Sequence, residues 1–125
     1  MNEIVRLGNS RRWSDVVIHA GVARWVEVAE DQTQDSRGQI AQVLRQIDLT
    51  LTQIGSDRTR LLEVLIFLSD LQDAAALNQL WDAWVPADHP PIRACVQAGL
   101  AASCRVEMIV TAAATTSSPP ASREP

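Results

Sequence analysis

The short segment at 93–98 carries polar side chains at every second position, with apolar residues between them. In a strand over 93–98, period-2 alternation places Arg93, Cys95 and Gln97 on one face. A guanidinium group grips a carboxylate through two parallel hydrogen bonds, so this face could hold an anionic ligand. The structural alternative is an ion pair between Arg93 and Glu107, which we expect on the neighbouring strand. The residues alone leave both interpretations open.

The residue types that are missing exclude several other chemistries. All eleven basic residues are arginine, and the chain contains neither lysine nor tyrosine. Schiff-base catalysis and a phosphate-loop lysine are therefore excluded, because both need a side-chain amine. A net charge of −4 also disfavours nucleic-acid binding, which depends on neutralising phosphates. The cysteines and histidines fit no metal-ligand spacing, and we expect packed, unpaired thiols.

The length of 125 residues predicts one domain. We expect this domain to span 1–114 and a flexible Ser- and Pro-rich tail to span 115–125, which holds too little apolar surface to order itself. No apolar stretch is long enough to cross a membrane, and the first residues do not resemble a signal peptide. We therefore expect a cytoplasmic protein without a membrane partner.

Two periodicities organise the rest of the chain. Alternating or continuous apolar runs predict strands over 15–19, 22–28, 61–68, 93–98 and 105–111, with a possible edge strand over 3–7. Apolar residues at three- and four-residue steps predict helices over 36–54 and 73–85. We expect Ser36 to cap the first helix and Gly55 to end it. This order predicts an α+β fold in which two helices pack on one face of a mixed sheet.

The opposite face of that sheet needs cover as well, because the predicted strands are apolar on both sides. A homo-oligomer that packs sheet against sheet would supply that cover.

Five sequence motifs, taken in order, match the pattern of a known protein family. They read RWSDVVIH at 12–19, LSD at 68–70, WDAW at 81–84, PIRACVQAGL at 91–100 and VEM at 106–108. In this order and with short gaps, they closely resemble the Rid family of reactive-intermediate deaminases, also called the YjgF family, and most of all its YoaB-like branch. The resemblance covers about 12–113, most of the chain.

The resemblance implies a fold similar to chorismate mutase and a homotrimer whose sheets line a central β-barrel. Helices would cover the outside, and three equivalent sites would lie in clefts between subunits. Well-known family members hydrolyse 2-imino acids and their enamine tautomers to 2-oxo acids and ammonia. They use no cofactor and no metal.

Individual residues match the family's functional positions. Arg93 matches the arginine that binds the substrate carboxylate, and Glu107 matches the glutamate that holds or activates the attacking water. Cys95 matches a cysteine that lines the pocket in some members. Asn78 matches a polar residue near the site, and Trp13 takes the place of an aromatic residue that closes over the substrate.

The match fails at one strand. Many members have a small residue and a glycine where this chain has Val26 and Glu27, and the glycine lets the backbone approach the substrate. A carboxylate at Glu27 could pair with Arg93 and compete with substrate, or it could point away from the site. If it blocks the pocket, Glu27→Gly should raise activity.

Two further functions remain as alternatives to imine hydrolysis. The departure at Val26 and Glu27 motivates a non-catalytic protein that binds small carboxylate metabolites on the same fold. The ribonuclease or translation-inhibitor activity attached to some relatives is disfavoured by the acidic charge, the absence of lysine and the lack of a paired-histidine site.

Overall fold

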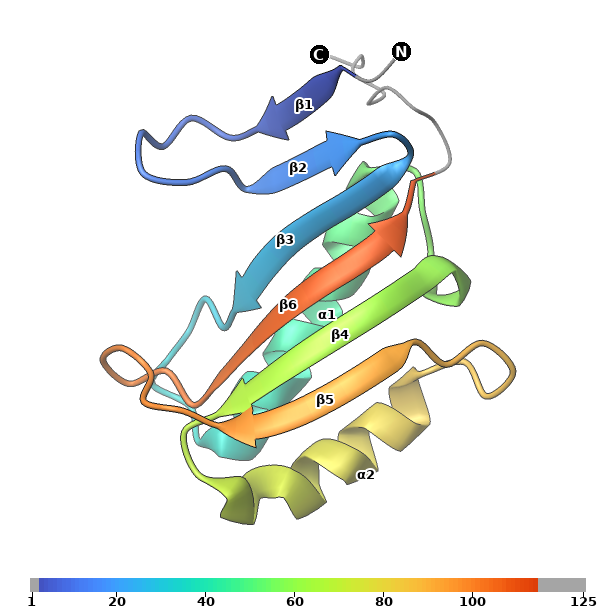
Figure 1. Ribbon diagram of the computed structural model, residues 1–125. Helices are drawn as coiled ribbons and strands as arrows, with labels where there is room; N and C mark the ends of the chain where they lie inside the picture. Colours follow the sequence, from blue (N-terminus) through green and yellow to red (C-terminus); the bar gives the residue numbers. More distant parts are fainter. Residues whose placement is uncertain (1–2, 115–125) are drawn as a thin grey trace.

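Six strands form one sheet, and two helices cover one of its faces (Figure 1). This arrangement comes from a computed structural model, which describes residues 3–114; the predicted tail at 115–125 lies outside the described residues. The strands are β1 (Ile4–Leu7), β2 (Val16–His19), β3 (Val22–Val28), β4 (Leu61–Leu68), β5 (Ile92–Gln97) and β6 (Val106–Ala113). The helices are α1 (Ser36–Gln53) and α2 (Ala74–Trp84), with short 3-10 turns η1 (Arg58–Arg60) and η2 (Leu71–Asp73). The predicted α+β class and mixed sheet are confirmed.

The strands lie in the order β1-β2-β3-β6-β4-β5. Neighbours are antiparallel except β4 and β5, which are parallel and joined through α2. A parallel pair needs a crossover connection, which the helix provides. The expectation that β5 lies beside β6 is wrong, because β4 runs between them and β5 forms the edge.

Helix α1 follows from its apolar spacing. Ile40, Val43, Leu44, Ile47 and Leu51 are all buried against the sheet. Its N-cap is Asp35, whose carboxylate accepts a hydrogen bond from the N–H of Gly38 at 2.9 Å, so the assignment of the cap to Ser36 is wrong by one residue. Gly55 follows the helix with a φ of 72°, as the sequence predicts for a stop.

Helix α2 presents Leu77, Trp81 and Trp84 to the core, and the two indole rings pack 5.5 Å apart. Both tryptophans belong to the buried core. Asp70 accepts a hydrogen bond from Gln72 and opens η2, the turn that leads into the helix.

The two sheet faces differ in what covers them. Alternate residues of the central strands, such as Val64, Ile66, Val106 and Met108, are buried under the helices. The opposite face, here called the open face, has no helix over it (Figure 1). It carries apolar side chains that include Val26, Val28, Phe67, Ile92, Val96 and Ile109. No helix within the described residues has the length and apolar character that a membrane crossing requires.

Candidate functional site

The predicted polar face of β5 exists and is turned toward α2. Arg93, Cys95 and Gln97 pair in register with Val64, Ile66 and Leu68, which are all buried on the helix side. The Arg93 guanidinium lies over the Trp81 ring, 5.4 Å from its centroid. The Gln97 side-chain oxygen accepts a hydrogen bond from the N–H of Leu71 at 2.9 Å. The edge strand and α2 therefore hold a cation against an aromatic surface.

The ion pair between Arg93 and Glu107 does not form within one chain. Glu107 lies opposite Phe67 on β4, whereas Arg93 lies opposite Val64, so the two residues lie on opposite faces of the sheet. Two strand spacings alone separate their strands by about 10 Å. Within residues 3–114, the Arg93 guanidinium stacks on Trp81 and forms no hydrogen bond or ion pair.

Cys95 and Asn78 belong to the same edge as Arg93. Cys95 is half-buried against the core, and desolvation raises the pKa of its thiol, an effect that the Arg93 charge opposes. The thiol is thus protonated at neutral pH and can line a pocket, but it is a weak nucleophile. Asn78 is exposed on α2, one turn before Trp81.

Glu107 lies elsewhere, in the wall of a cavity of about 860 Å³. The cavity extends around the end of β3, whose last residues have no partner in β2, and reaches α1. Its wall contains Trp13, Asp15, Trp25, Val26, Glu27, Val28, Glu30, Thr50, Gln53, Ala101 and Glu107, with a short stretch at 7–8 and residues 14 and 16. This volume is in the range of pockets for small organic ligands.

Trp13 is placed at this cavity by the loop between β1 and β2. The loop is tied by a hydrogen bond from the N–H of Asp15 to the carbonyl of Leu7 at 2.8 Å. Gly8 turns the chain with a φ of 105°, and Asp15 packs so closely there that a side chain at Gly8 would collide with it. The indole of Trp13 is 64% exposed, unlike the other three tryptophans. The indole ring of Trp13 thus lies beside the cavity and is largely exposed to solvent.

Glu27 lies on the helix side of β3 and does not contact Arg93 within one chain. Its carboxylate accepts hydrogen bonds from Trp25 Nε1 at 2.9 Å, Gln46 Nε2 at 3.0 Å and Thr50 Oγ1 at 3.3 Å. Burial raises the pKa of Glu27, and these three donors counteract part of that rise. Val26, in contrast, is on the open face and 53% exposed.

The residues predicted for the site therefore form two groups in one chain. Arg93, Cys95 and Asn78 lie along the β5–α2 edge. Trp13, Glu27 and Glu107 line the cavity beside β3.

Sequence reasoning missed the side chains that hold the cavity loops. Gln39, Gln42 and Gln46 project from α1 toward the segment after β3. Gln46 binds the N–H of Glu30 and the carbonyl of Val28, and Gln42 binds both backbone groups of Asp31. Three glutamines spaced by three and four residues on a largely buried helix face are the signal that could have revealed them.

Gln39 also connects this segment to a second loop. Its amide nitrogen donates to the carbonyl of Ser103 at 3.0 Å, and its oxygen accepts from the N–H of Arg105 at 2.8 Å. Arg105 comes two residues before Glu107, so Gln39 helps to fix the start of β6.

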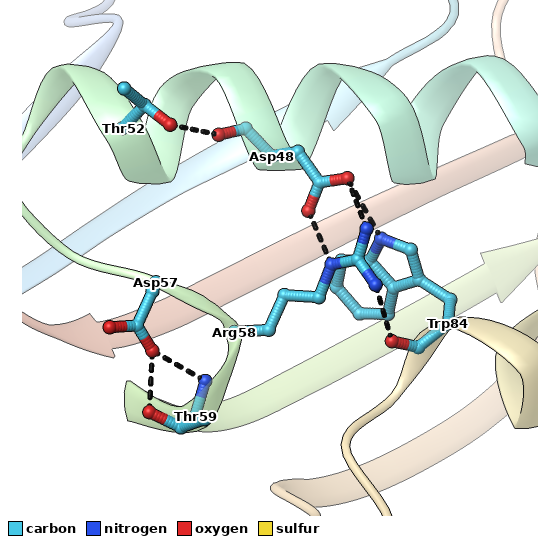
Figure 2. A network of polar contacts seen from close by, with 6 residues as sticks. All are labelled: Asp48, Thr52, Asp57, Arg58, Thr59 and Trp84. Carbon is cyan, nitrogen blue, oxygen red and sulfur yellow. Dashed lines mark hydrogen bonds and ion pairs between the residues drawn. The ribbon is translucent and has the colours of Figure 1, made fainter.

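A second unpredicted group stabilises the helix layer away from the cavity (Figure 2). Arg58 binds both carboxylate oxygens of Asp48 at 2.7 and 2.8 Å and donates to the carbonyl of Trp84 at 2.9 Å. Its guanidinium also stacks on the Trp84 ring, 5.1 Å from the centroid. These contacts join α1, η1 and the end of α2.

The family model described as Endoribonuclease L-PSP matches residues 6–114. The RutC family protein YoaB of Escherichia coli is 47% identical over 97 residues, which cover 78% of this chain and 85% of YoaB. A RutC family protein of Haemophilus influenzae is 40% identical and covers 87% of this chain and 97% of its own.

Solved structures agree with these matches. A YjgF family member from Neisseria meningitidis superposes with a TM-score of 0.86 at 39% identity, over 91% of this chain and 97% of that one. A Salmonella typhimurium protein, described as a candidate translation initiation inhibitor, gives 0.84 at 45% identity over 90% and 99% of the two chains. The chain thus belongs to the Rid family, also named YjgF and RutC, and is similar to its YoaB members.

Proposed function

We propose that the protein hydrolyses 2-imino acids and their enamine tautomers to 2-oxo acids and ammonia, in clefts between the subunits of a homotrimer. The observation that carries this proposal is the division of the predicted site residues into two groups. One chain offers a free guanidinium at its β5 edge and a carboxylate in a cavity beside β3, on opposite faces of the sheet. A site that uses both groups needs two chains.

The open face supports the assembly. Exposed Val26, Ile92 and Val96 lie on it, and burying such a surface is favourable. A contact that joins the β5 edge of one chain to the cavity of the next is heterologous, because it uses different surfaces of the two copies. Repeated around a rotation axis, such a contact closes into a ring, and a trimer with the sheets toward the axis satisfies this geometry.

The two groups have complementary chemical roles. Arg93 binds the substrate carboxylate through two parallel hydrogen bonds and thereby fixes the imine carbon. Glu107 of the adjoining chain holds a water and accepts its proton as the oxygen attacks that carbon. The C–O bond forms while the C=N electron pair moves to nitrogen. Glu107 then passes this proton to the nitrogen and removes the remaining hydroxyl proton, so that the C=O bond forms as the C–N bond breaks. The second proton leaves with the ammonia, and the other product is the 2-oxo acid.

The remaining residues shape the pocket. Cys95 and Asn78 are expected to border the substrate beside Arg93, and Trp13 to close over it from the cavity side. Trp13 supplies an apolar surface that excludes water from the substrate. It has no phenol hydroxyl, so it cannot donate the hydrogen bond that a tyrosine at this position would donate. The reaction as written needs no metal or cofactor.

The proposal is tested by generating imines with an amino-acid oxidase and trapping them with semicarbazide. Active protein lowers the yield of trapped imine, because it hydrolyses the imine before the trap reacts. We expect Arg93→Ala and Glu107→Gln to abolish this effect, while Arg45→Ala, which removes an exposed arginine from α1, preserves it. An undiminished yield with the wild-type protein across several amino acids would refute imine hydrolysis.

The binding-protein alternative gives a different result in the same variants. It predicts saturable binding of 2-oxo acids by calorimetry, lost in Arg93→Ala, without any effect on the trapped imine. Cleavage of RNA that persists after repurification would instead support the nuclease activity named in the family description.

A further inference from the structure

One arginine of this chain binds a carboxylate while it lies on a tryptophan ring. The guanidinium carbon of Arg58 is 5.1 Å from the centroid of the Trp84 ring. The same guanidinium binds both carboxylate oxygens of Asp48, at 2.7 and 2.8 Å (Figure 2). An indole ring on one side of a guanidinium group therefore leaves the donors at its edge available for two parallel hydrogen bonds.

Arg93 has the same support without the carboxylate. Its guanidinium carbon lies 5.4 Å from the centroid of the Trp81 ring, and Trp81 precedes Trp84 by one turn of α2. Among residues 3–114 the only ion pair is that of Arg58, so no carboxylate binds Arg93 as Asp48 binds Arg58. A substrate carboxylate could therefore bind Arg93 in the way that Asp48 binds Arg58.

The Trp81 ring is a fixed support. Its side chain is 6% exposed, and its ring packs against the Trp84 ring, 5.5 Å away and tilted by 46°. Trp84 is held in turn by Asp48, which accepts a hydrogen bond from its Nε1 at 3.3 Å, and by Arg58, which donates to its carbonyl. Packing and hydrogen bonds thus leave the Trp81 ring little freedom to move.

Arg93 needs such a support because of its place in the fold. It lies on the edge strand β5, which pairs only with β4, and its side chain is exposed. A long exposed side chain samples many rotamers, and a ligand that orders it must offset the lost entropy. Contact with a fixed aromatic ring restricts these rotamers before the ligand binds.

We infer that Trp81 is the residue that positions Arg93: its buried ring holds the guanidinium group so that the edge donors are available to the substrate carboxylate. This inference rests on the proposed function, because it concerns the same arginine. Trp81 itself does not touch the substrate and acts only through Arg93. Loss of its ring should therefore raise KM and leave kcat, which depends on Glu107, nearly unchanged.

Trp81→Phe and Trp81→Leu form a matched pair of variants. Both place a smaller apolar side chain in the core, but only phenylalanine keeps an aromatic face for the cation. We expect Trp81→Leu to raise KM for the imine and Kd for the stable 2-oxo acid roughly fivefold, which corresponds to the loss of one exposed cation–π contact. Trp81→Phe should recover part of this loss.

Leu80→Ala is the control for altered helix packing. It removes a partly buried apolar side chain from α2, next to Trp81, without changing an aromatic ring. This variant should keep the KM and Kd of the wild-type protein.

NMR measures the contact itself without any ligand. In protein that contains isotope-labelled arginine, the Nε–H resonance of Arg93 is identified by its absence in Arg93→Ala. We expect this group in the wild-type protein to have a higher order parameter than the Nε–H of the exposed Arg45 on α1. In Trp81→Leu the order parameter of Arg93 should fall to that of Arg45.

The two readouts separate this inference from the proposed function. Loss of order at Arg93 together with weaker 2-oxo acid binding in Trp81→Leu supports the inference, even where no imine is hydrolysed. An Arg93 side chain that is equally mobile with and without the Trp81 ring overturns it and leaves imine hydrolysis intact. Equal losses of binding in Trp81→Phe, Trp81→Leu and Leu80→Ala also overturn it, because they would reflect packing of the helix and not the aromatic face.

Discussion

Arg93 and Glu107 lie on opposite faces of the same sheet, with strand β4 between their strands. Neither residue can reach the other without passing around the sheet. Their combination in one site requires the β5 edge of one chain and the cavity of another, so the oligomer becomes part of the proposed mechanism.

This arrangement predicts complementation between two inactive variants. Arg93→Ala retains Glu107, and Glu107→Gln retains Arg93, so a mixed trimer contains some clefts with both native residues. Random assortment at equal amounts leaves both native residues in roughly a quarter of the clefts, and about that fraction of wild-type activity should return. The measurement is imine hydrolysis after the two variants are unfolded together and refolded.

The control for complementation is each variant refolded alone, which should stay inactive. Sedimentation should show a trimer in all samples. A stable monomer, or a trimer mixture without recovered activity, would contradict the shared site.

The fold was largely predictable from the sequence, because its elements follow from local patterns. The run over 61–68 forms β4 and 22–28 forms β3 with the predicted bounds, since a largely apolar segment and an alternating one of this length both fit a strand. The Ala20–Gly21 turn joins β2 to β3 as a two-residue hairpin connection, with His19 paired to Val22.

The errors concern relations between distant segments. Sequence order suggests that β5 and β6 are neighbours, but β6 instead enters the sheet between β3 and β4. Alternation shows that Arg93 and Cys95 share a face, yet it cannot tell which face the helices cover. The contacts of Glu27 with Gln46 and Thr50 depend on α1 crossing β3, which no local pattern specifies.

Glu27 should make stability depend on pH. In the folded chain burial raises its pKa above the ordinary value of 4.5, whereas the unfolded chain titrates near that value. As the pH rises through this interval, the unfolded state releases its proton first, so the folded state holds more protons and loses stability. The unfolding free energy of the wild-type protein relative to Glu27→Gln should therefore fall with rising pH and level off above the folded pKa.

Urea denaturation at several pH values measures this difference. Glu63→Gln, on β4 and outside the cavity, is a suitable control, and it should show no comparable trend. A difference for Glu27→Gln that stays constant or grows with pH would show that burial does not raise its pKa.

Arg58 should contribute to stability through its contacts with Asp48 and Trp84. The pair is bidentate, but the side chains remain 41% and 32% exposed, so solvent screening reduces its strength. We expect Arg58→Ala to lower the unfolding free energy by about 1–2 kcal/mol. Arg58→Lys should lose most of the same stability, because lysine cannot form the two parallel hydrogen bonds. Thermal and urea unfolding check both, and a fully stable Arg58→Lys would contradict a role for the planar guanidinium.

Gln39 should couple the stability of the chain to the geometry of the cavity. Its side chain is fully buried and bonds the carbonyls of Gln32, Gln34 and Ser103 as well as the N–H of Arg105. Gln39→Leu fills a similar volume but leaves these buried backbone groups without partners, each at a cost of about 1–3 kcal/mol. We expect a loss of roughly 3 kcal/mol in urea unfolding, because water satisfies some of the groups.

Activity provides the second measurement for Gln39. The start of β6 would be less well fixed in Gln39→Leu, and Glu107 would hold its water less accurately, so kcat should fall at temperatures where the variant remains folded. Binding of 2-oxo acids through Arg93 should change little, because Gln39 does not contact the β5–α2 edge. Gln72→Ala removes an exposed glutamine side chain and is the matched control for Gln39→Leu. This control variant should retain both stability and activity. A Gln39→Leu variant that weakens 2-oxo acid binding as strongly as it lowers kcat would indicate a general loss of structure instead of a displaced Glu107.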